Sequence, residues 1–422
     1  MRAMLGLRYR VRRLLAVWAT ATLLAPIPVG GVGAQAPQLT WLGLLPDYDY
    51  WGVATGVSAD GSVVVGYAYG TGGRYRAFRW TVSGGMQDLG TLPGYVNSAA
   101  LGVSADGSVV VGSAYNTSRY ARAFRWTASG GMEALDTLGG LESAAYGVSA
   151  DGLVVVGWAE TGFPYYYRRA FRWTDSMGME ALGTLGGDWG AAYGVSADGS
   201  AVVGWTENAG YQGRAFRWMV SGGMEDLGTL PGYVNSTASG VSADGSVVVG
   251  WAENQSSERR AFRWSAVGGM QNLGTLGGLE SAAYGVSADG SVVVGFTRDR
   301  YTNPRAFRWT PARGMEDLNQ IYYHLLFPGS DLISGRAISP DGRYIVGSGY
   351  NAITRRQEPF LLDTGFPRRG DVDRNGCVND ADLLRVLFAF GERGYRNEDI
   401  DWNGVIDAGD LLIVLFNFGN GC

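Results

Sequence analysis

The sequence predicts an all-β fold in which seven four-stranded sheets close into a ring, followed by a small α-helical module. Three observations predict it: an internal repeat, a β-like segment displaced to the start of the chain, and two acidic loops at its end. The stretch "GVSADGSVVVG" at Gly240–Gly250 recurs with small changes from Gly56, Gly102, Gly147, Gly194 and Gly285, and as "AISPDGRYIVG" from Ala337. A period of roughly 46 residues indicates that each repeat forms one supersecondary unit.

Each repeat contains four β-like segments. In the second repeat these are residues 99–104, 108–115, 122–127 and 131–138, which are rich in Val, Phe, Trp and Tyr and are separated by Asp-Gly or Gly-Gly turns. Four strands in roughly 46 residues are typical of a propeller blade. We therefore predict a seven-bladed β-propeller over residues 37–365. The alternative, an open solenoid, needs polar capping repeats, and the sequence has none.

The fourth segment of the last repeat is found at the other end of the chain. The third segment carries a Phe in all seven repeats, at Phe78, Phe124, Phe171, Phe216, Phe262, Phe307 and Phe360. The fourth segment follows only the first six, with its Met at Met86, Met132, Met179, Met224, Met270 and Met315, and "TWLGLLPDY" at Thr40–Tyr48 supplies the missing copy. We expect the strand around Trp41 to pair beside Phe360 and close the ring, because closure removes free sheet edges.

The Asp of the repeated Ser-x-Asp-Gly turn occurs in every repeat, from Asp60 to Asp341. A side chain that hydrogen-bonds its own turn, beside a Gly that can adopt positive φ, explains this repetition better than catalysis does. The repeated arginines, such as Arg76 and Arg79, are expected to pair with acids such as Asp88.

The segments "GVSADGSVVVG", "RAFRWT" and "GGMEDLGTLPGY" resemble the HAF family of extracellular repeats of secreted bacterial proteins. The resemblance covers about residues 39–362 and implies an extracellular repeat protein, with no chemistry assigned to it. The His-Ala-Phe that names the family is Arg-Ala-Phe here, as at Arg122-Ala123-Phe124.

Ligand specificity is expected where the repeats differ, in the connections between second and third strands. These connections are rich in Tyr, Asn, Gln and Arg, which stack on sugars or hydrogen-bond to hydroxyls and carboxylates. The predicted ligand-binding platforms for a glycan or a protein are Tyr165, Tyr166, Tyr167 and Trp189. The alternative is that these are ordinary solvated loops.

No catalytic residue is predicted. The single histidine, His324, lies in an atypical insertion with no cluster of partners beside it. The alternative function is a carbohydrate-active enzyme, a glycoside hydrolase or polysaccharide lyase on a propeller scaffold, because a pair of repeat-specific carboxylates would suffice for hydrolysis. Its candidates are Asp47, Asp49, Asp175, Asp188 and Asp299.

Residues 371–422 form a different module, joined by a linker at residues 366–370. Two loops, "DVDRNGCVNDAD" and "DIDWNGVIDAGD", carry oxygen donors at positions 1, 3, 5, 9 and 12, a Gly at position 6 and a carbonyl ligand at position 7. We predict two bound Ca²⁺ ions. The predicted ligands are Asp371, Asp373, Asn375, Cys377, Asn379 and Asp382, and Asp399, Asp401, Asn403, Val405, Asp407 and Asp410.

With the apolar helices that follow each loop, this module resembles a type I dockerin. The resemblance implies a cohesin-like partner, although the Ser/Thr pair of dockerins at positions 10 and 11 is here Asp380-Ala381 and Ala408-Gly409. The two cysteines of the chain, Cys377 and Cys422, are expected to form a disulfide, because so small a module needs stapling.

The remaining expectations concern location and partners. Arginines followed by the apolar run Leu14–Ala25 and by Ala34-Gln35-Ala36 predict a signal peptide at residues 1–36, and hence a secreted protein without a transmembrane segment in the mature chain. The uncleaved anchor is the alternative. A net charge of −5 argues against a nucleic-acid partner. We expect a monomer.

Overall fold

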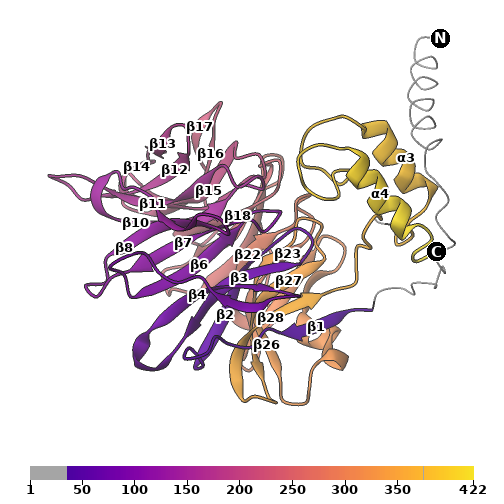
Figure 1. The fold of residues 1–422 in the computed structure, drawn as a ribbon. Helices are drawn as coiled ribbons and strands as arrows, with labels where there is room; N and C mark the ends of the chain where they lie inside the picture. The colour runs from indigo at the N-terminus through magenta and orange to yellow at the C-terminus, as the bar shows by residue number, and fades with distance from the viewer. Residues whose placement is uncertain (1–35, 374) are drawn as a thin grey trace, which may run out of the picture. The chain divides into compact units, whose positions relative to one another are not determined.

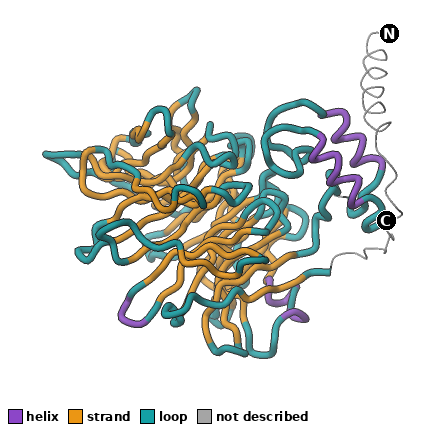
Figure 2. Tube along the Cα trace, in the orientation of Figure 1, coloured by secondary structure: helices purple, strands orange, loops and turns teal. Residues whose placement is uncertain are grey.

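Strands dominate the computed structural model, which describes residues 36–373 and 375–422. The predicted signal peptide, up to residue 35, lies outside the described residues. The strands form five four-stranded antiparallel sheets and one eight-stranded sheet (Figures 1 and 2). The larger sheet consists of two four-stranded groups, joined by a single parallel pair between Trp51 and Gln357.

Each four-stranded group is a meander whose strands occupy four equivalent positions. The first strands are β2 (Trp51–Val57), β6 (Asn97–Val103), β10 (Gly139–Val148), β14 (Gly186–Val195), β18 (Asn235–Val241), β22 (Gly277–Val286) and β26 (Asp331–Ile338). The second strands are β3 (Val63–Tyr69), β7 (Val109–Tyr115), β11 (Val155–Thr161), β15 (Ala201–Asn208), β19 (Val247–Glu253), β23 (Val293–Asp299) and β27 (Tyr344–Asn351). The third strands are β4 (Tyr75–Thr81), β8 (Ala121–Thr127), β12 (Arg168–Thr174), β16 (Gly213–Met219), β20 (Arg259–Ser265), β24 (Pro304–Thr310) and β28 (Arg356–Asp363). The fourth strands are β5 (Gly85–Asp88), β9 (Gly131–Ala134), β13 (Gly178–Ala181), β17 (Gly223–Asp226), β21 (Gly269–Asn272), β25 (Gly314–Asp317) and, from the start of the chain, β1 (Gln38–Trp41).

The first strands surround a common channel. A chain of backbone hydrogen bonds links the turns that follow them, running from Ala59 N–H to the Ala105 carbonyl (2.8 Å) and on, group by group, to the bond from Ala288 N–H to the Pro340 carbonyl (2.8 Å). Pro340 has no N–H, so the last bond of this ring, to the Ala59 carbonyl, cannot form. The fold is therefore closed at this point by other contacts.

The displaced first strand supplies that closure. β1 pairs antiparallel with β28, and Trp41 lies opposite Phe360. This confirms the predicted ring closure. The arrangement of four-stranded meanders around a channel defines a β-propeller.

The repeated sequence is explained by the packing of each group. The seven repeated phenylalanines are fully buried. Beside them, a Cβ added to Gly66 would lie 2.0 Å from the Val53 carbonyl oxygen and 2.7 Å from the Phe78 ring, so the last residue of the "VVVG" motif must be Gly. In the turn, the Ser58 hydroxyl donates to Asp60 Oδ1 (2.8 Å) and Ser62 N–H donates to the same oxygen (2.9 Å). The repeated Asp therefore shapes the turn.

The meanders differ in the length of their first strands. β10, β14 and β22 begin at the Gly-Gly of a "TLGG" motif, whereas β6 and β18 follow "TLPG" and begin several residues later. Pro fixes φ and cannot donate to a ladder, so pairing starts only beyond it.

The helical elements lie in connections between strands and in the C-terminal module. The insertion before β26 forms α2 (Leu318–Ile321) and the 3₁₀ turn η2 (Tyr323–Leu325), and a further 3₁₀ turn, η1 (Thr71–Gly73), lies between β3 and β4. The C-terminal module contains α3 (Asp380–Ala389) and α4 (Ala408–Asn417), which contact each other around Val378, Val386, Ile406 and Val414.

Candidate metal sites and ligand-binding surfaces

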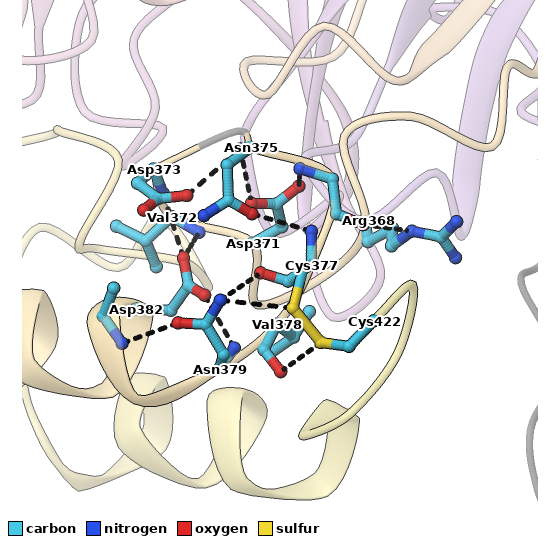
Figure 3. Close-up of a disulfide and its surroundings, with 12 residues drawn as sticks. Arg368, Asp371, Val372, Asp373, Asn375, Cys377, Val378, Asn379, Asp382 and Cys422 are labelled. Atoms are coloured by element: carbon cyan, nitrogen blue, oxygen red, sulfur yellow. Dashed lines mark hydrogen bonds between the residues drawn. A yellow bond between two sulfur atoms is a disulfide. The ribbon is translucent and has the colours of Figure 1, made fainter.

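Two clusters of three carboxylates are the most distinctive polar feature of the C-terminal module. Asp371, Asp373 and Asp382 form the first, and Asp399, Asp401 and Asp410 form the second. In each cluster, one oxygen from every carboxylate lies within 4.8 Å of the others. Figure 3 shows the first cluster in the loop before α3, close to the disulfide.

Backbone N–H groups hold these carboxylates in place. The Val372 N–H donates to Asp382 Oδ1 (2.7 Å), and the Gly376 N–H donates to Asp371 Oδ2 (2.9 Å). The second loop repeats both contacts, from Ile400 N–H to Asp410 Oδ1 (2.5 Å) and from Gly404 N–H to Asp399 Oδ2 (2.9 Å). Each loop is thus folded around its carboxylates by its own backbone.

Burial and mutual repulsion act on the carboxylates of both clusters. Burial raises the pKa of Asp399 to about 7, opposed by the Gly404 N–H and reinforced by the carboxylates of Asp410 and Asp401. Burial also raises the pKa values of Asp371 and Asp410. Three carboxylates held together in this way destabilise the fold unless a proton or a cation neutralises them. The donor set, all oxygen, fits a hard divalent cation.

The other predicted ligands have more varied surroundings. Asn375 and Asn403 lie in the loops, where each side-chain oxygen accepts from the N–H of the residue two positions on, Cys377 or Val405 (2.8 Å in both). At position 9, the side chains of Asn379 and Asp407 cap α3 and α4 by accepting from Ala381 N–H and Gly409 N–H (2.7 Å in both). Asp407 is not part of the carboxylate cluster of its loop. The sequence pattern alone did not distinguish this capping role from ligation.

A disulfide joins the first loop to the end of the chain. Cys377 and Cys422 are bonded, with their Cα atoms 4.8 Å apart. The disulfide uses the Cys377 side chain, whereas the predicted ligand at position 7 is the Cys377 backbone carbonyl. The bond therefore does not consume the predicted ligand. Asn379 Nδ2 donates to that carbonyl (3.5 Å).

The predicted platforms lie on and beside the connection between β11 and β12. The rings of Tyr165 and Tyr167 are stacked, with centroids 5.4 Å apart, and Tyr165, Tyr166 and Trp189 are exposed. Trp189 lies on β14 and approaches this connection through Arg168, whose guanidinium carbon is 5.8 Å from its ring centroid. The structure therefore brings Tyr165 and Tyr167 together, while Trp189 contacts an arginine of the same region.

Three of the five candidate carboxylates for catalysis are engaged in ion pairs. Asp49, Asp188 and Asp299 lie in different meanders, and each pairs with an arginine: Arg356 (2.9 Å), Arg169 (3.7 Å) and Arg305 (3.4 Å), respectively. His324 is exposed in η2, where its ring lies against Tyr323. These contacts favour structural roles for all four side chains.

Sequence reasoning missed a second set of surface residues, at the mouth of the channel. The residue before each "GVS" motif, on the first strand, faces this opening; among these residues are Tyr146, Tyr193, Tyr284 and Arg336. A usable signal was present, because this position varies among the first six repeats while the Ala before it and the Gly-Val after it do not.

Comparison with known proteins found no matching family model and no matching curated protein. Solved structures that are similar include the β-propeller domain of the trilobed protease from Pyrococcus furiosus, with 9% identity, a TM-score of 0.49, and coverage of 74% of this chain and 95% of that one. BP39L lectin from Burkholderia pseudomallei has 8% identity and a TM-score of 0.47, over 74% of this chain and 95% of the lectin. TolB from Acinetobacter baumannii has 14% identity and a TM-score of 0.42, over 76% of this chain and 65% of TolB.

The class of the protein follows from its own strand register: a β-propeller with an appended helical module. Within residues 36–373 and 375–422, the helices are all too short or too polar to cross a bilayer.

Proposed function

We propose that this chain is a secreted, non-catalytic, seven-bladed β-propeller of the HAF type. It binds a glycan or protein ligand through its variable loops, and it attaches to a cohesin-like partner through a calcium-dependent, dockerin-like module. The observation that carries this proposal is the pair of three-carboxylate clusters in two equivalent loops, each with two of its three carboxylates buried. Such clusters destabilise the module by mutual repulsion unless a cation neutralises them.

Calcium is the cation that the donor set favours. Each loop offers three carboxylates, a side-chain amide oxygen and a backbone carbonyl, and Ca²⁺ accepts such mixed oxygen ligands with flexible geometry. Asp371, Asp373, Asn375, Cys377 and Asp382 would hold the first ion. Their counterparts Asp399, Asp401, Asn403, Val405 and Asp410 would hold the second. The bound ion would neutralise the repelling carboxylates and so stabilise both helices.

The attachment surface is proposed on the outward sides of these helices. Leu384 and Phe388 on α3 are 48% and 69% exposed, and Leu412 and Phe416 on α4 are 47% and 84% exposed. The two pairs occupy equivalent positions after the two loops. Large exposed apolar side chains in this arrangement are typical of a protein-binding surface.

The experiment is calorimetric titration of Ca²⁺ into the chelator-treated chain from residue 36 to residue 422. We expect two ions per chain. The double variant Asp382→Asn, Asp410→Asn removes one carboxylate from each cluster and should abolish tight binding. Asp380→Asn is the matched control, because Asp380 is exposed and outside the clusters. A wild-type chain that binds no Ca²⁺ would refute the calcium-dependent module.

A further inference from the structure

The mouth of the channel differs from the rest of the ring in its chemistry. Seven equivalent positions, one from each first strand, line the opening: Thr55, Leu101, Tyr146, Tyr193, Ser239, Tyr284 and Arg336. With Trp251 and the backbone beside them they enclose a hollow of about 440 Å³. This volume lies in the range of ligand pockets. If the position served only the fold, the repeats would be expected to share one residue there, as the first six do at the neighbouring Gly and Val; the seventh has Ala337 and Ile338 at those places.

Two of the tyrosines are arranged as hydrogen-bond donors. The Tyr146 hydroxyl accepts from Trp158 Nε1 (3.3 Å), and the Tyr193 hydroxyl accepts from Trp205 Nε1 (3.0 Å). Because an indole can only donate, each phenol keeps its own hydrogen for another acceptor. Burial raises the pKa values of both tyrosines, so both hydroxyls remain protonated.

Arg336 is the one charged residue among those that line the hollow. Its side chain is exposed, and its guanidinium carbon lies 4.4 Å from the centroid of the Tyr284 ring. Within the described part of the chain it forms no ion pair. Three other arginines that lie over aromatic rings of second strands are each paired with a glutamate: Arg168 with Glu142 (3.0 Å), Arg259 with Glu253 (3.1 Å) and Arg298 with Glu280 (2.9 Å).

The hollow therefore combines a cation without an ion pair, hydroxyl donors and aromatic rings, and none of the described residues that line it carries a carboxylate. A guanidinium binds a carboxylate through paired hydrogen bonds, and that of Arg336 lies over the Tyr284 ring. Aromatic rings stack on the apolar face of a sugar, and phenol donors suit its hydroxyls. A carboxylate-bearing sugar matches all three features, whereas a neutral sugar leaves Arg336 without a partner and an acidic peptide makes no use of the ring faces.

We propose that the channel mouth binds a hexuronate residue of an acidic polysaccharide, with its carboxylate on Arg336 and its ring against the aromatic residues of the opening. The inference rests on the proposed glycan-binding function but assigns it to the channel and to one substrate class. It does not involve the platforms at Tyr165–Tyr167 and Trp189.

The test compares two tetrasaccharides that differ only in their carboxylates, β-1,4-linked tetraglucuronate and cellotetraose. Binding of each to the chain of residues 36–422 is measured by calorimetry at low salt. We expect tetraglucuronate to bind at least about tenfold more tightly than cellotetraose, since a hydrogen bond to a charged group accounts for that much. Raising the salt concentration should weaken the binding of the uronate and leave the neutral sugar unchanged.

Variants locate the site. Arg336→Gln should weaken tetraglucuronate binding by about 10- to 100-fold. Arg336→Lys keeps the charge but loses the paired hydrogen bonds, so its affinity should lie between those of wild type and Arg336→Gln. Arg298→Gln is the matched control, because Arg298 also lies over an aromatic ring, that of Phe296 outside the hollow, and is already paired with Glu280. Thermal unfolding verifies that each variant is folded.

The possible outcomes separate this inference from the function on which it rests. If tetraglucuronate binds but Arg336→Gln has no effect, the channel site is wrong while glycan binding stands. If Tyr165→Ala abolishes binding and Arg336→Gln does not, the ligand lies on the variable loops and the inference again fails. If wild type binds neither tetrasaccharide, the inference is overturned, while the calcium-dependent module remains to be judged by its own titration.

Discussion

Trp41 lies directly opposite Phe360 in the sheet, and their rings meet edge to face, with centroids 6.3 Å apart and planes at 76°. This pair joins the two ends of the ring. The same sheet contains Pro340, which has no N–H to donate to the Ala59 carbonyl and so leaves the ring of backbone hydrogen bonds around the channel incomplete. Closure of the propeller therefore depends on β1.

Trp41→Ala should destabilise the propeller. The change removes the ring that packs against Phe360 and beside Gly349, and because Trp41 is only half-buried we expect a loss of about 2 kcal/mol, below the full cost of removing a core Trp. Urea unfolding measures this loss. Val82→Ala serves as the control, because Val82 is 76% exposed. Equal unfolding midpoints for the two variants would mean that β1 does not stabilise the closed ring.

Gly112→Ala should be poorly tolerated. A Cβ at this position would lie 2.0 Å from the Ala99 carbonyl oxygen and 2.8 Å from the Phe124 ring. Overpacking of this kind costs about 1–3 kcal/mol. Gly222→Ala is the matched control, because a Cβ there meets no atom within 4 Å. The thermal unfolding midpoint should fall for the first variant and stay constant for the second; a normal midpoint for Gly112→Ala would contradict the packing argument.

The repeated turns should make the propeller sensitive to acid. Burial of the Asp106 carboxyl raises its pKa, but hydrogen bonds from the Ser104 hydroxyl and from Ser108 outweigh this and lower the pKa below its ordinary value. Asp60, Asp198 and Asp244 are shifted in the same direction. A carboxyl whose folded-state pKa lies below its unfolded value of about 3.9 stabilises the fold above that pH, and its contribution disappears as the pH falls through the folded-state pKa.

Asp106→Asn tests whether the turn aspartates make the fold less stable in acid. Between about pH 5 and about pH 3, the urea midpoint of the variant should fall less than that of wild type, because one acid-sensitive turn has been removed. Asp175→Asn, at an exposed position outside the repeated turns, should follow wild type. An identical acid dependence for all three proteins would argue against these turns as its source.

Removal of calcium should expose the C-terminal module to trypsin. Arg385, Arg393 and Arg396 lie on α3 and in the segment that follows it. Calcium at a hundredfold excess over its Kd would stabilise the folded module by about 2.7 kcal/mol per site. Cleavage should then slow by about a hundredfold if opening releases one ion, and by about ten-thousandfold if it releases both. Mass spectrometry of the C-terminal fragments measures the rate.

The matched variants for this experiment are Asp382→Asn and Asp380→Asn. The first should be cleaved rapidly even with calcium, and the second should behave like wild type. Cleavage that is equally fast with calcium and with chelator in the wild-type chain would show that the loops do not couple a cation to folding.

The predicted platforms can be tested on a glycan array. Tyr165→Ala should disrupt the stack with Tyr167, and Trp189→Ala removes an exposed ring beside Arg168. If the variable loops bind a sugar, each change should weaken binding by about 2- to 13-fold, corresponding to the loss of one aromatic contact. Tyr301→Ala is the control, since Tyr301 is 73% exposed in the equivalent connection of another repeat. Unchanged binding in both platform variants would leave these loops as solvated connections.

The sequence by itself determined the repeat, the four strands of each unit and the closing role of the segment around Trp41. These features depend on local patterns, such as apolar strands, Asp-Gly turns and the count of fourth segments, and the chain displays them directly. The sequence also located the acidic loops, because the predicted ligands of each loop lie within twelve consecutive residues.

The tertiary structure alone decided which distant residues meet. Tyr146, Tyr193, Tyr284 and Arg336 lie in separate repeats, and only the closed ring places them around one opening. The tertiary structure also decided how the carboxylates behave. Burial raises the pKa of Asp399 to about 7, and this burial depends on how the loop packs against its helices. Asp407 matches the ligand pattern, and the structure adds that its Oδ1 caps α4, because a carboxylate at a helix N-terminus satisfies backbone N–H groups that otherwise lack partners.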